Sequence, residues 1–148
     1  MGLRRKSREL FVQTFYALLH TDTDQYLQHL DYINKYEEIL SDLAVDNEIA
    51  NNSSIYKFAE SMLKNIFPKI DEIDEVIHNN IGEYKVENLG MLEMIILRMA
   101  IYEILFEKTP AAVVINEAVE ITKKYCAEKS PSLLNAILDK IHEKEDKE

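Results

Sequence analysis

The sequence predicts an all-α fold of about seven helices in one domain, with two small helical subdomains of about residues 1–68 and 69–148. Apolar residues recur every three or four positions along nearly the whole chain, which is the period of an amphipathic helix. The 148 residues include three glycines and three prolines, too few for the many turns of an all-β fold. A content of 47% hydrophobic and 30% charged residues is typical of a globular protein large enough to bury a core.

The first half of the chain predicts three helices. The first covers roughly residues 3–20, and its core face is formed by Leu3, Leu10, Phe11, Thr14, Phe15 and Leu18. A second amphipathic helix begins near Tyr26, and the polar stretch "SDLAVDNEIANNSS" that follows it predicts a loop. The third helix is expected to be capped by Ser53 or Ser54 and to end near Pro68, since proline cannot continue a helix.

The second half predicts four more helices. Ile70 and Ile77 mark the first, which is followed by the break "GEYKVENLG". The next segment, "MLEMIILRMAIYEILFE", is apolar on nearly all sides, which indicates a buried central helix. It is too short and too charged to span a membrane. Because unpaired buried charges are costly, we expect Arg98 and Glu103 to find partners on the final two helices.

Two dipeptides predict the starts of the last two helices. Thr109-Pro110 and Ser130-Pro131 each place a hydroxyl at the N-cap and a proline at the first helical position. The closing "HEKEDKE" is expected to be a frayed, solvated tail.

The sequence lacks the patterns that an enzyme would need. Its four histidines have no metal-ligand spacing, and it contains no glycine-rich phosphate loop and no G-x-S-x-G motif. Cys126 is the only cysteine, which excludes an intramolecular disulfide and fits a cytoplasmic location. We therefore expect no catalytic activity, no metal, no cofactor and no membrane contact.

Charge is distributed unevenly along the chain. Residues 1–8 carry four cations, Arg4, Arg5, Lys6 and Arg8, whereas the remaining residues carry 13 cations and 27 acids, a net charge of −14. A basic segment attracts nucleic acid and an acidic body repels it. The alternative is that these cations form an ordinary solvated chain end.

The first helix also carries a stripe that suits RNA. Arg5, Glu9, Val12 and Tyr16 follow helical spacing, and we expect them to lie away from the core face. A guanidinium for phosphate and an aromatic ring for an unpaired base are the two elements of single-stranded RNA recognition. Alternatively, Tyr16 is a half-buried ring that packs on a neighbouring helix.

Four segments together resemble the NusB family of bacterial transcription antitermination factors. "RRKSRELFVQTFYAL" is similar to the family's opening, with its arginine cluster, R-E and Q-x-x-Y. "ILRMAIYEILF" resembles I-L-R-x-A-x-Y-E-L, and "TPAAVVINEAVEITKKY" resembles P-x-x-V-x-I-N-E-A-V-E-x-x-K. "SPSLLNAILDKI" resembles S-x-x-F-V-N-G-V-L-D-K. The matches follow the family's order and span nearly the whole chain.

The chain departs from the family pattern at four positions. Ala136 replaces the usual glycine, Leu133 replaces an aromatic residue, Lys129 stands where an acid is common, and Ala112 stands where a lysine is common. The absence of the aromatic residue and of the lysine removes two possible RNA contacts at this end of the chain.

The resemblance implies a non-enzymatic factor that joins the small-subunit ribosomal protein NusE. Together they would bind boxA RNA and load an antitermination complex onto RNA polymerase during ribosomal RNA transcription. The residues that would contact RNA are Arg4, Arg5, Lys6, Arg8, Tyr16, Lys129 and Ser130. The resemblance places a partner-facing acid at Glu93, and Met94 and Leu97 complete the expected partner contact.

Two other functions remain open from the sequence. The chain could be a helical protein–protein adaptor without an RNA role, and salt-dependent RNA binding would separate this from the first interpretation. A NusB-like domain also occurs in some RNA cytosine methyltransferases, but this chain has no room for a methyl-donor domain and would need a separate catalytic chain.

Overall fold

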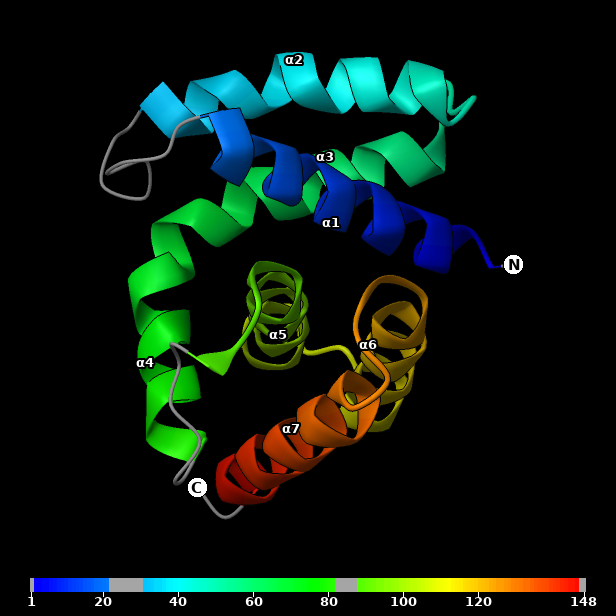
Figure 1. Ribbon diagram of the computed structural model, residues 1–148. Coiled ribbons are helices and arrows are strands. Elements are labelled where there is room, and N and C mark those ends of the chain that lie inside the picture. The colour runs from blue at the N-terminus through cyan, green and yellow to red at the C-terminus, as the bar shows by residue number, and fades with distance from the viewer. Residues whose placement is uncertain (1, 22–30, 82–87, 147–148) are drawn as a thin grey trace. The chain divides into compact units, whose positions relative to one another are not determined.

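The computed structural model describes residues 2–21, 31–81 and 88–146. Within these ranges the chain forms seven α-helices and contains no strand (Figure 1). The prediction of an all-α fold is confirmed. The helices fall into two compact units, Met1–Pro68 and Lys69–Glu148. No helix in the described ranges is long and apolar enough to cross a membrane.

The first unit contains α1 (Leu3–Thr21), α2 (Asp31–Asp46) and α3 (Ser54–Ile66), and the 3-10 turn η2 (Phe67–Lys69) follows α3. Each of the three helices packs against the other two, with α1, the blue helix of Figure 1, in contact with both α2 and α3. The core of this unit consists of fully buried side chains from all three helices, among them Leu10, Phe11, Phe15, Leu18, Leu40, Met62, Leu63 and Ile66. The predicted start of the second helix near Tyr26 lies outside the described residues.

The buried side of α1 is wider than its spacing predicted. Leu3 is 60% exposed, whereas Glu9 and Val12 are buried. The expectation that the stripe from Arg5 to Tyr16 lies away from the core is therefore wrong at its two middle positions. The reason is that α1 contacts two helices, so more than one of its faces is covered.

The connection between α2 and α3 is shorter than predicted. The polar stretch from Ser41 onwards was expected to be a loop, but α2 continues to Asp46. The helix ends in a Schellman motif: the Glu48 N–H bonds the Val45 carbonyl (3.0 Å) and the Ile49 N–H bonds the Ala44 carbonyl (2.8 Å). Glu48 takes the left-handed conformation, with φ 57°, that this motif needs and that glycine usually supplies.

The start of α3 agrees with the sequence. Ser53 is the N-cap, and its hydroxyl oxygen accepts a hydrogen bond from the Tyr56 N–H (3.2 Å). This bond satisfies one of the N–H groups that a helix start leaves without a partner.

The second unit contains α4 (Ile70–Asn80), α5 (Met91–Leu105), α6 (Ala111–Tyr125) and α7 (Ser130–Asp146). In this unit α5 contacts the other three helices (Figure 1). Every residue of α5 from Ile95 to Glu103 is buried, which confirms the prediction of a central helix.

Arg98, a buried charge of α5, has an ion-pair partner on α4. The Arg98 guanidinium forms a two-point ion pair with Asp74 of α4, through Nε–Oδ1 (2.8 Å) and Nη2–Oδ2 (3.0 Å). The sequence did not predict this partner on α4, which also packs on α5 and places a carboxylate beside Arg98. Glu103 is almost completely buried.

The ends of α6 and α7 differ slightly from the predictions. Pro110 itself is the N-cap of α6, and its carbonyl accepts the N–H groups of Val113 and Val114. Ser130 is the first residue of α7 and not its cap. The predicted frayed tail is wrong as far as Asp146, because α7 runs on without a stop signal and Ile141 anchors its last turns in the core.

Candidate nucleic-acid interface

The four N-terminal cations lie in the first two turns of α1, but they differ in exposure. Arg4 and Lys6 are exposed and Arg5 is half-buried. Arg8 is only 4% exposed. Phosphate in solution therefore reaches Arg4, Lys6 and Arg5 more readily than Arg8.

Two of these cations, Arg4 and Arg8, lie near the aromatic ring of Phe58 on α3. The Arg4 guanidinium carbon lies 4.0 Å from the centre of the Phe58 ring, and that of Arg8 lies 5.9 Å from it. Both distances are within the range of a cation–π interaction, which is more favourable when the cation is shielded from water. Arg4 makes no ion pair with any described residue, so the contact orients its charge without neutralising it.

Sequence patterns did not identify Phe58 as part of this site. A phenylalanine among the apolar residues of a helix is typical of a core position, whereas Phe58 is half-buried. The contact joins residues about fifty positions apart, and it exists because α1 packs along α3. Aromatic residues at the edge of a core face are the signal that could have suggested it.

Tyr16 lies two turns further along α1 and is half-buried. Its ring packs edge-on against His20 of the same helix, with centroids 4.3 Å apart and planes 68° apart. Because Glu9 and Val12 between them are buried, Tyr16 and Arg5 do not form one continuous exposed stripe.

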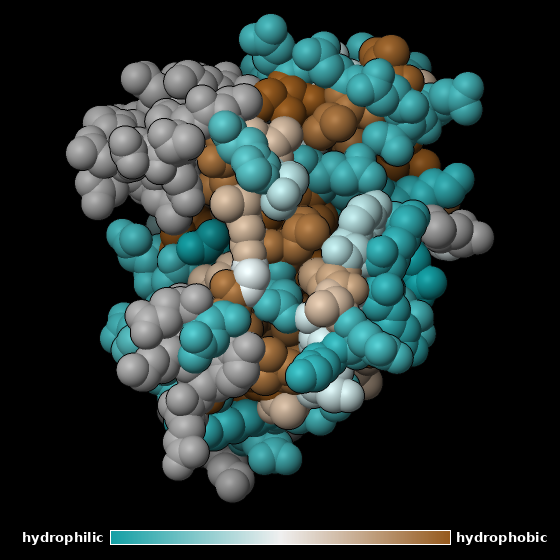
Figure 2. Space-filling model, viewed as in Figure 1, coloured by the Kyte–Doolittle hydropathy of each residue, from teal (hydrophilic) through white to brown (hydrophobic). Residues whose placement is uncertain are grey.

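The first unit also carries an acidic side on α2. In the same unit, α2 exposes Glu37, Glu38 and Asp42. Figure 2 shows hydrophilic side chains over much of α2, at the top of the view. The first unit therefore has a basic start on α1 and an acidic outer side on α2.

The second unit holds the other predicted RNA contacts. Lys129 is exposed immediately before α7, so its ammonium is available to phosphate. Ser130 is only 3% exposed, so little of its surface is available for the predicted RNA contact. The sequence placed it at the surface as a helix cap, but it is the first residue of the helix itself.

The predicted partner contact lies at the start of α5. Glu93 and Met94 are half-buried and leave part of their surface open. Leu97 is completely buried, so it belongs to the core and has no surface to offer a partner. Because α5 is apolar on all sides, its sequence could not show which of its residues face out.

Glu93 also has a structural role. Its Oε1 accepts a hydrogen bond from the Gly90 N–H (2.7 Å), which caps the helix start. Such a bond fixes the carboxylate in place, and its negative charge suits the positive end of the helix dipole.

Cys126 lies close enough to Glu93 to respond to its charge. Burial raises the pKa of the Cys126 thiol to about 11, and the Glu93 carboxylate contributes to the same rise. The thiol is therefore neutral at physiological pH, without the nucleophilic character of a thiolate. Across the described ranges no group of three or more His, Cys, Asp or Glu side chains is arranged to hold a metal ion.

Known proteins resemble this chain over nearly its whole length. The model of the NusB family matches residues 5–143. A transcription antitermination protein NusB from Aliarcobacter butzleri is 35% identical over 142 residues, which cover 95% of this chain and 98% of the relative. Another from Thermodesulfovibrio yellowstonii is 34% identical over 143 residues, covering 96% and 93%.

Solved structures share the fold. The structure of T. maritima NusB aligns with a TM-score of 0.73 at 26% identity and covers 97% of this chain and 92% of its own. A chain from the crystal structure of the antitermination factors NusB and NusE in complex with double-stranded RNA aligns with a TM-score of 0.78 at 22% identity, covering 97% and 98%. These matches also agree with the prediction of a non-enzymatic factor. Because the family match spans residues 5–143 and the relatives align over nearly their full length, this chain belongs to the NusB family of transcription antitermination proteins.

Proposed function

We propose that this protein acts with the ribosomal protein NusE to bind boxA-type single-stranded RNA. The two proteins would support ribosomal RNA transcription as part of an antitermination complex with RNA polymerase. Membership of the NusB family is the first support. A structural neighbour that shares the fold has been crystallised with NusE and RNA. A role in transcription would place the protein in the cytoplasm.

The observation that carries the RNA proposal is the arrangement at the start of α1. Arg4 is held over Phe58 at 4.0 Å, and Lys6 is exposed on the same turns. A guanidinium that is already oriented loses less conformational entropy when it binds phosphate. Arg4, Arg5 and Lys6 would therefore supply the phosphate contacts. The buried Arg8 guanidinium contacts the Phe58 ring.

Two further residues would extend the RNA contact. Tyr16 keeps part of its ring accessible and would stack on an unpaired base. Lys129 would contact phosphate from the second unit.

The acidic body explains why a partner would be needed. Residues 9–148 carry a net charge of −14, which repels RNA at low ionic strength. A basic ribosomal protein bound to this chain would reduce the repulsion and add phosphate contacts of its own. The half-buried pair Glu93 and Met94 is the part of the predicted partner contact that has accessible surface.

A fluorescence-anisotropy titration of labelled boxA-type RNA tests this function. The RNA is titrated with this protein alone, with NusE alone and with the two together, at several salt concentrations. We expect weak binding by the isolated protein and much tighter binding by the mixture, with an affinity that falls as salt rises. Equal affinity of NusE for RNA with and without this protein would favour the alternative of an adaptor without an RNA role.

The role of Glu93 in the partner contact can be separated from its role as a cap. Glu93→Gln keeps a side-chain oxygen for the Gly90 N–H but removes the charge. We expect the unfolding free energy of this variant to lie within about 0.5 kcal/mol of the wild-type value. We expect it to bind NusE a few-fold more weakly. Glu93→Lys loses the cap as well and should cost about 1 kcal/mol of stability. Unchanged NusE affinity in Glu93→Gln would assign this residue to helix capping alone.

A further inference from the structure

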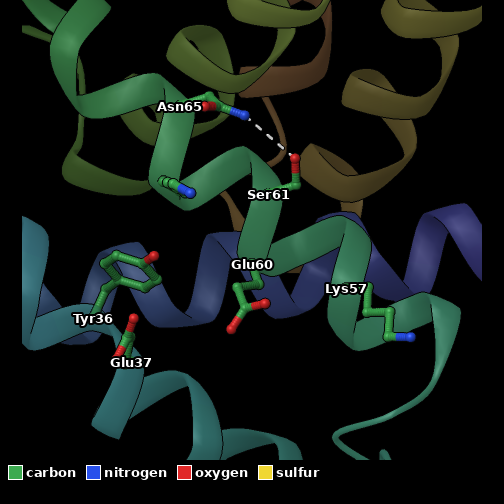
Figure 3. A pocket seen from close by; sticks show the side chains of 7 residues that line it. Tyr36, Glu37, Lys57, Glu60, Ser61 and Asn65 are labelled. Atoms are coloured by element: carbon green, nitrogen blue, oxygen red, sulfur yellow. Dashed lines mark hydrogen bonds between the residues drawn. The ribbon is translucent and has the colours of Figure 1, made fainter.

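His20 is an exposed aromatic residue in the last turn of α1. Its ring packs edge-on against Tyr16, one turn earlier in the same helix, with centroids 4.3 Å apart. Neither residue lines the pocket between α2 and α3, whose lining includes two lysines and two glutamates (Figure 3). The pair is therefore a separate feature of the surface of the first unit.

This pair differs from the aromatic contacts of the core. Phe11 packs on Phe15 with centroids 5.8 Å apart, and both rings are completely buried. Tyr16 is only half-buried and His20 is exposed, so RNA in solution can reach part of both rings. An edge-to-face contact is a favoured arrangement of aromatic rings, so each ring restricts the movement of the other.

A half-buried tyrosine alone offers a base only part of a ring. His20 adds an exposed ring beside it, which enlarges the aromatic surface available for stacking. Bases stack on tyrosine and histidine alike, because every base has a π face. A ring that is already held in place also loses less conformational entropy when a base stacks on it. The pair therefore has the chemistry of a site for an unpaired base.

The two rings lie far from the cations at the start of α1. Arg4 and His20 are about 24 Å apart along the helix axis, at about 1.5 Å of rise per residue. Glu9 and Val12, between them, are buried, so the two ends of α1 are separate contact areas. Different nucleotides would therefore contact the cations and the rings, and changes at the two ends should act independently.

We propose that His20 is a further RNA-contacting residue, which together with Tyr16 forms a two-ring platform for one unpaired base. The inference rests on the proposed function, in which Tyr16 stacks on a base, and it assigns His20 to the same contact. The base lies against the exposed His20 ring and the accessible part of Tyr16. Stacking is an uncharged contact, so it adds affinity without adding to the salt dependence that the cations provide.

Anisotropy titration of labelled boxA-type RNA with the complex of NusE and the full-length chain tests this platform. His20→Ala should weaken RNA binding at least about fivefold, as expected for the loss of a stacked base, with a nearly unchanged salt slope. His20→Gln keeps a polar side chain but has no ring, so a loss of the same size is expected. His20→Phe keeps a ring and should bind within about twofold of the wild type.

Combined variants show whether the two rings contact the same base. Tyr16→Ala removes the other ring, and its combination with His20→Ala should lose clearly less affinity than the product of the two single losses. The combination of His20→Ala with Arg4→Gln should lose the full product, because these residues lie at opposite ends of α1.

His78→Ala is the matched control, because His78 is an exposed histidine in the last turn of another helix, α4. We expect it to bind RNA as tightly as the wild type, and circular dichroism melting curves check that each variant keeps its fold. Equal affinities of His20→Ala and His78→Ala would overturn the proposal. Full affinity of His20→Gln, or a loss equal to the product in the double variant with Tyr16→Ala, would overturn it as well. Absence of salt-dependent RNA binding by the unaltered complex would instead contradict the proposed function itself.

Discussion

At the scale of single residues, the ion pair between Arg98 and Asp74 is a contact that sequence patterns could not identify. The two residues lie 24 positions apart on α4 and α5. The charge at position 98 was expected to need a partner, but the choice of partner depends on which helix packs beside it. The same limit applies to Phe58 under Arg4, and to the burial of Arg8, Leu97 and Ser130.

The variant Asp74→Asn tests how much this ion pair contributes to the free energy of unfolding. The change removes the negative charge that Asp74 places beside the buried Arg98 guanidinium, and we expect it to cost about 1.5–3 kcal/mol of unfolding free energy. Urea denaturation measures this as a lower midpoint with an unchanged slope. Glu75→Gln, an exposed neighbour on α4, is the control and should stay within about 0.5 kcal/mol of the wild type. Similar losses in the two variants would show that the pair adds nothing specific.

The thiol of Cys126 makes a second prediction at this scale. Its pKa is raised to about 11 from an ordinary value near 9, so at pH 8 the folded protein should react with iodoacetamide about a hundredfold more slowly than the urea-unfolded chain. The raised pKa also means that the unfolded state releases this proton first. The unfolding free energy should therefore fall as the pH rises from about 9 to about 11. Equal alkylation rates in the two states would contradict the assigned environment.

At the scale of elements, hydrophobic periodicity located the helices better than their ends. The buried run of α5 and the core face of α7 agree with their sequence patterns. The Ser53 cap was also correct, because a hydroxyl before an amphipathic segment has a local physical cause. The end of α2 was missed, because Glu48 holds the left-handed position where glycine would have signalled a stop.

Substitution of Glu48 by glycine is therefore expected to stabilise the C-terminal end of α2. A non-glycine residue at φ 57° is strained, and Glu48→Gly should stabilise the protein by about 0.5–1 kcal/mol after the greater entropy of the unfolded chain is counted. Differential scanning calorimetry should show a Tm about 1–4 °C higher. Glu48→Ala keeps the same steric problem and should show no gain. A gain of the same size in the alanine variant would indicate that removal of the charge is responsible.

At the scale of the whole molecule, the contrast between a basic N-terminus and an acidic body was visible in the sequence and supports the proposed function. Helical spacing and composition predicted the all-α class, and the family resemblance supplied the particular fold and the partner. The sequence could not show which cations are accessible, because that depends on packing in the folded unit. The structure separates the exposed Arg4 and Lys6 and the half-buried Arg5 from the buried Arg8.

The most direct test is the salt dependence of RNA binding by the complex with NusE. If Arg4, Arg5 and Lys6 each neutralise one phosphate, the triple variant Arg4→Gln, Arg5→Gln, Lys6→Gln should lower the slope of log K against log salt concentration by about 2. A control triple, Lys108→Gln, Lys140→Gln, Lys144→Gln, removes the same charge from exposed positions elsewhere and should leave the slope nearly unchanged. An unchanged slope in the N-terminal triple variant, or an equal decrease in both, would contradict the assignment of this end of α1 to RNA.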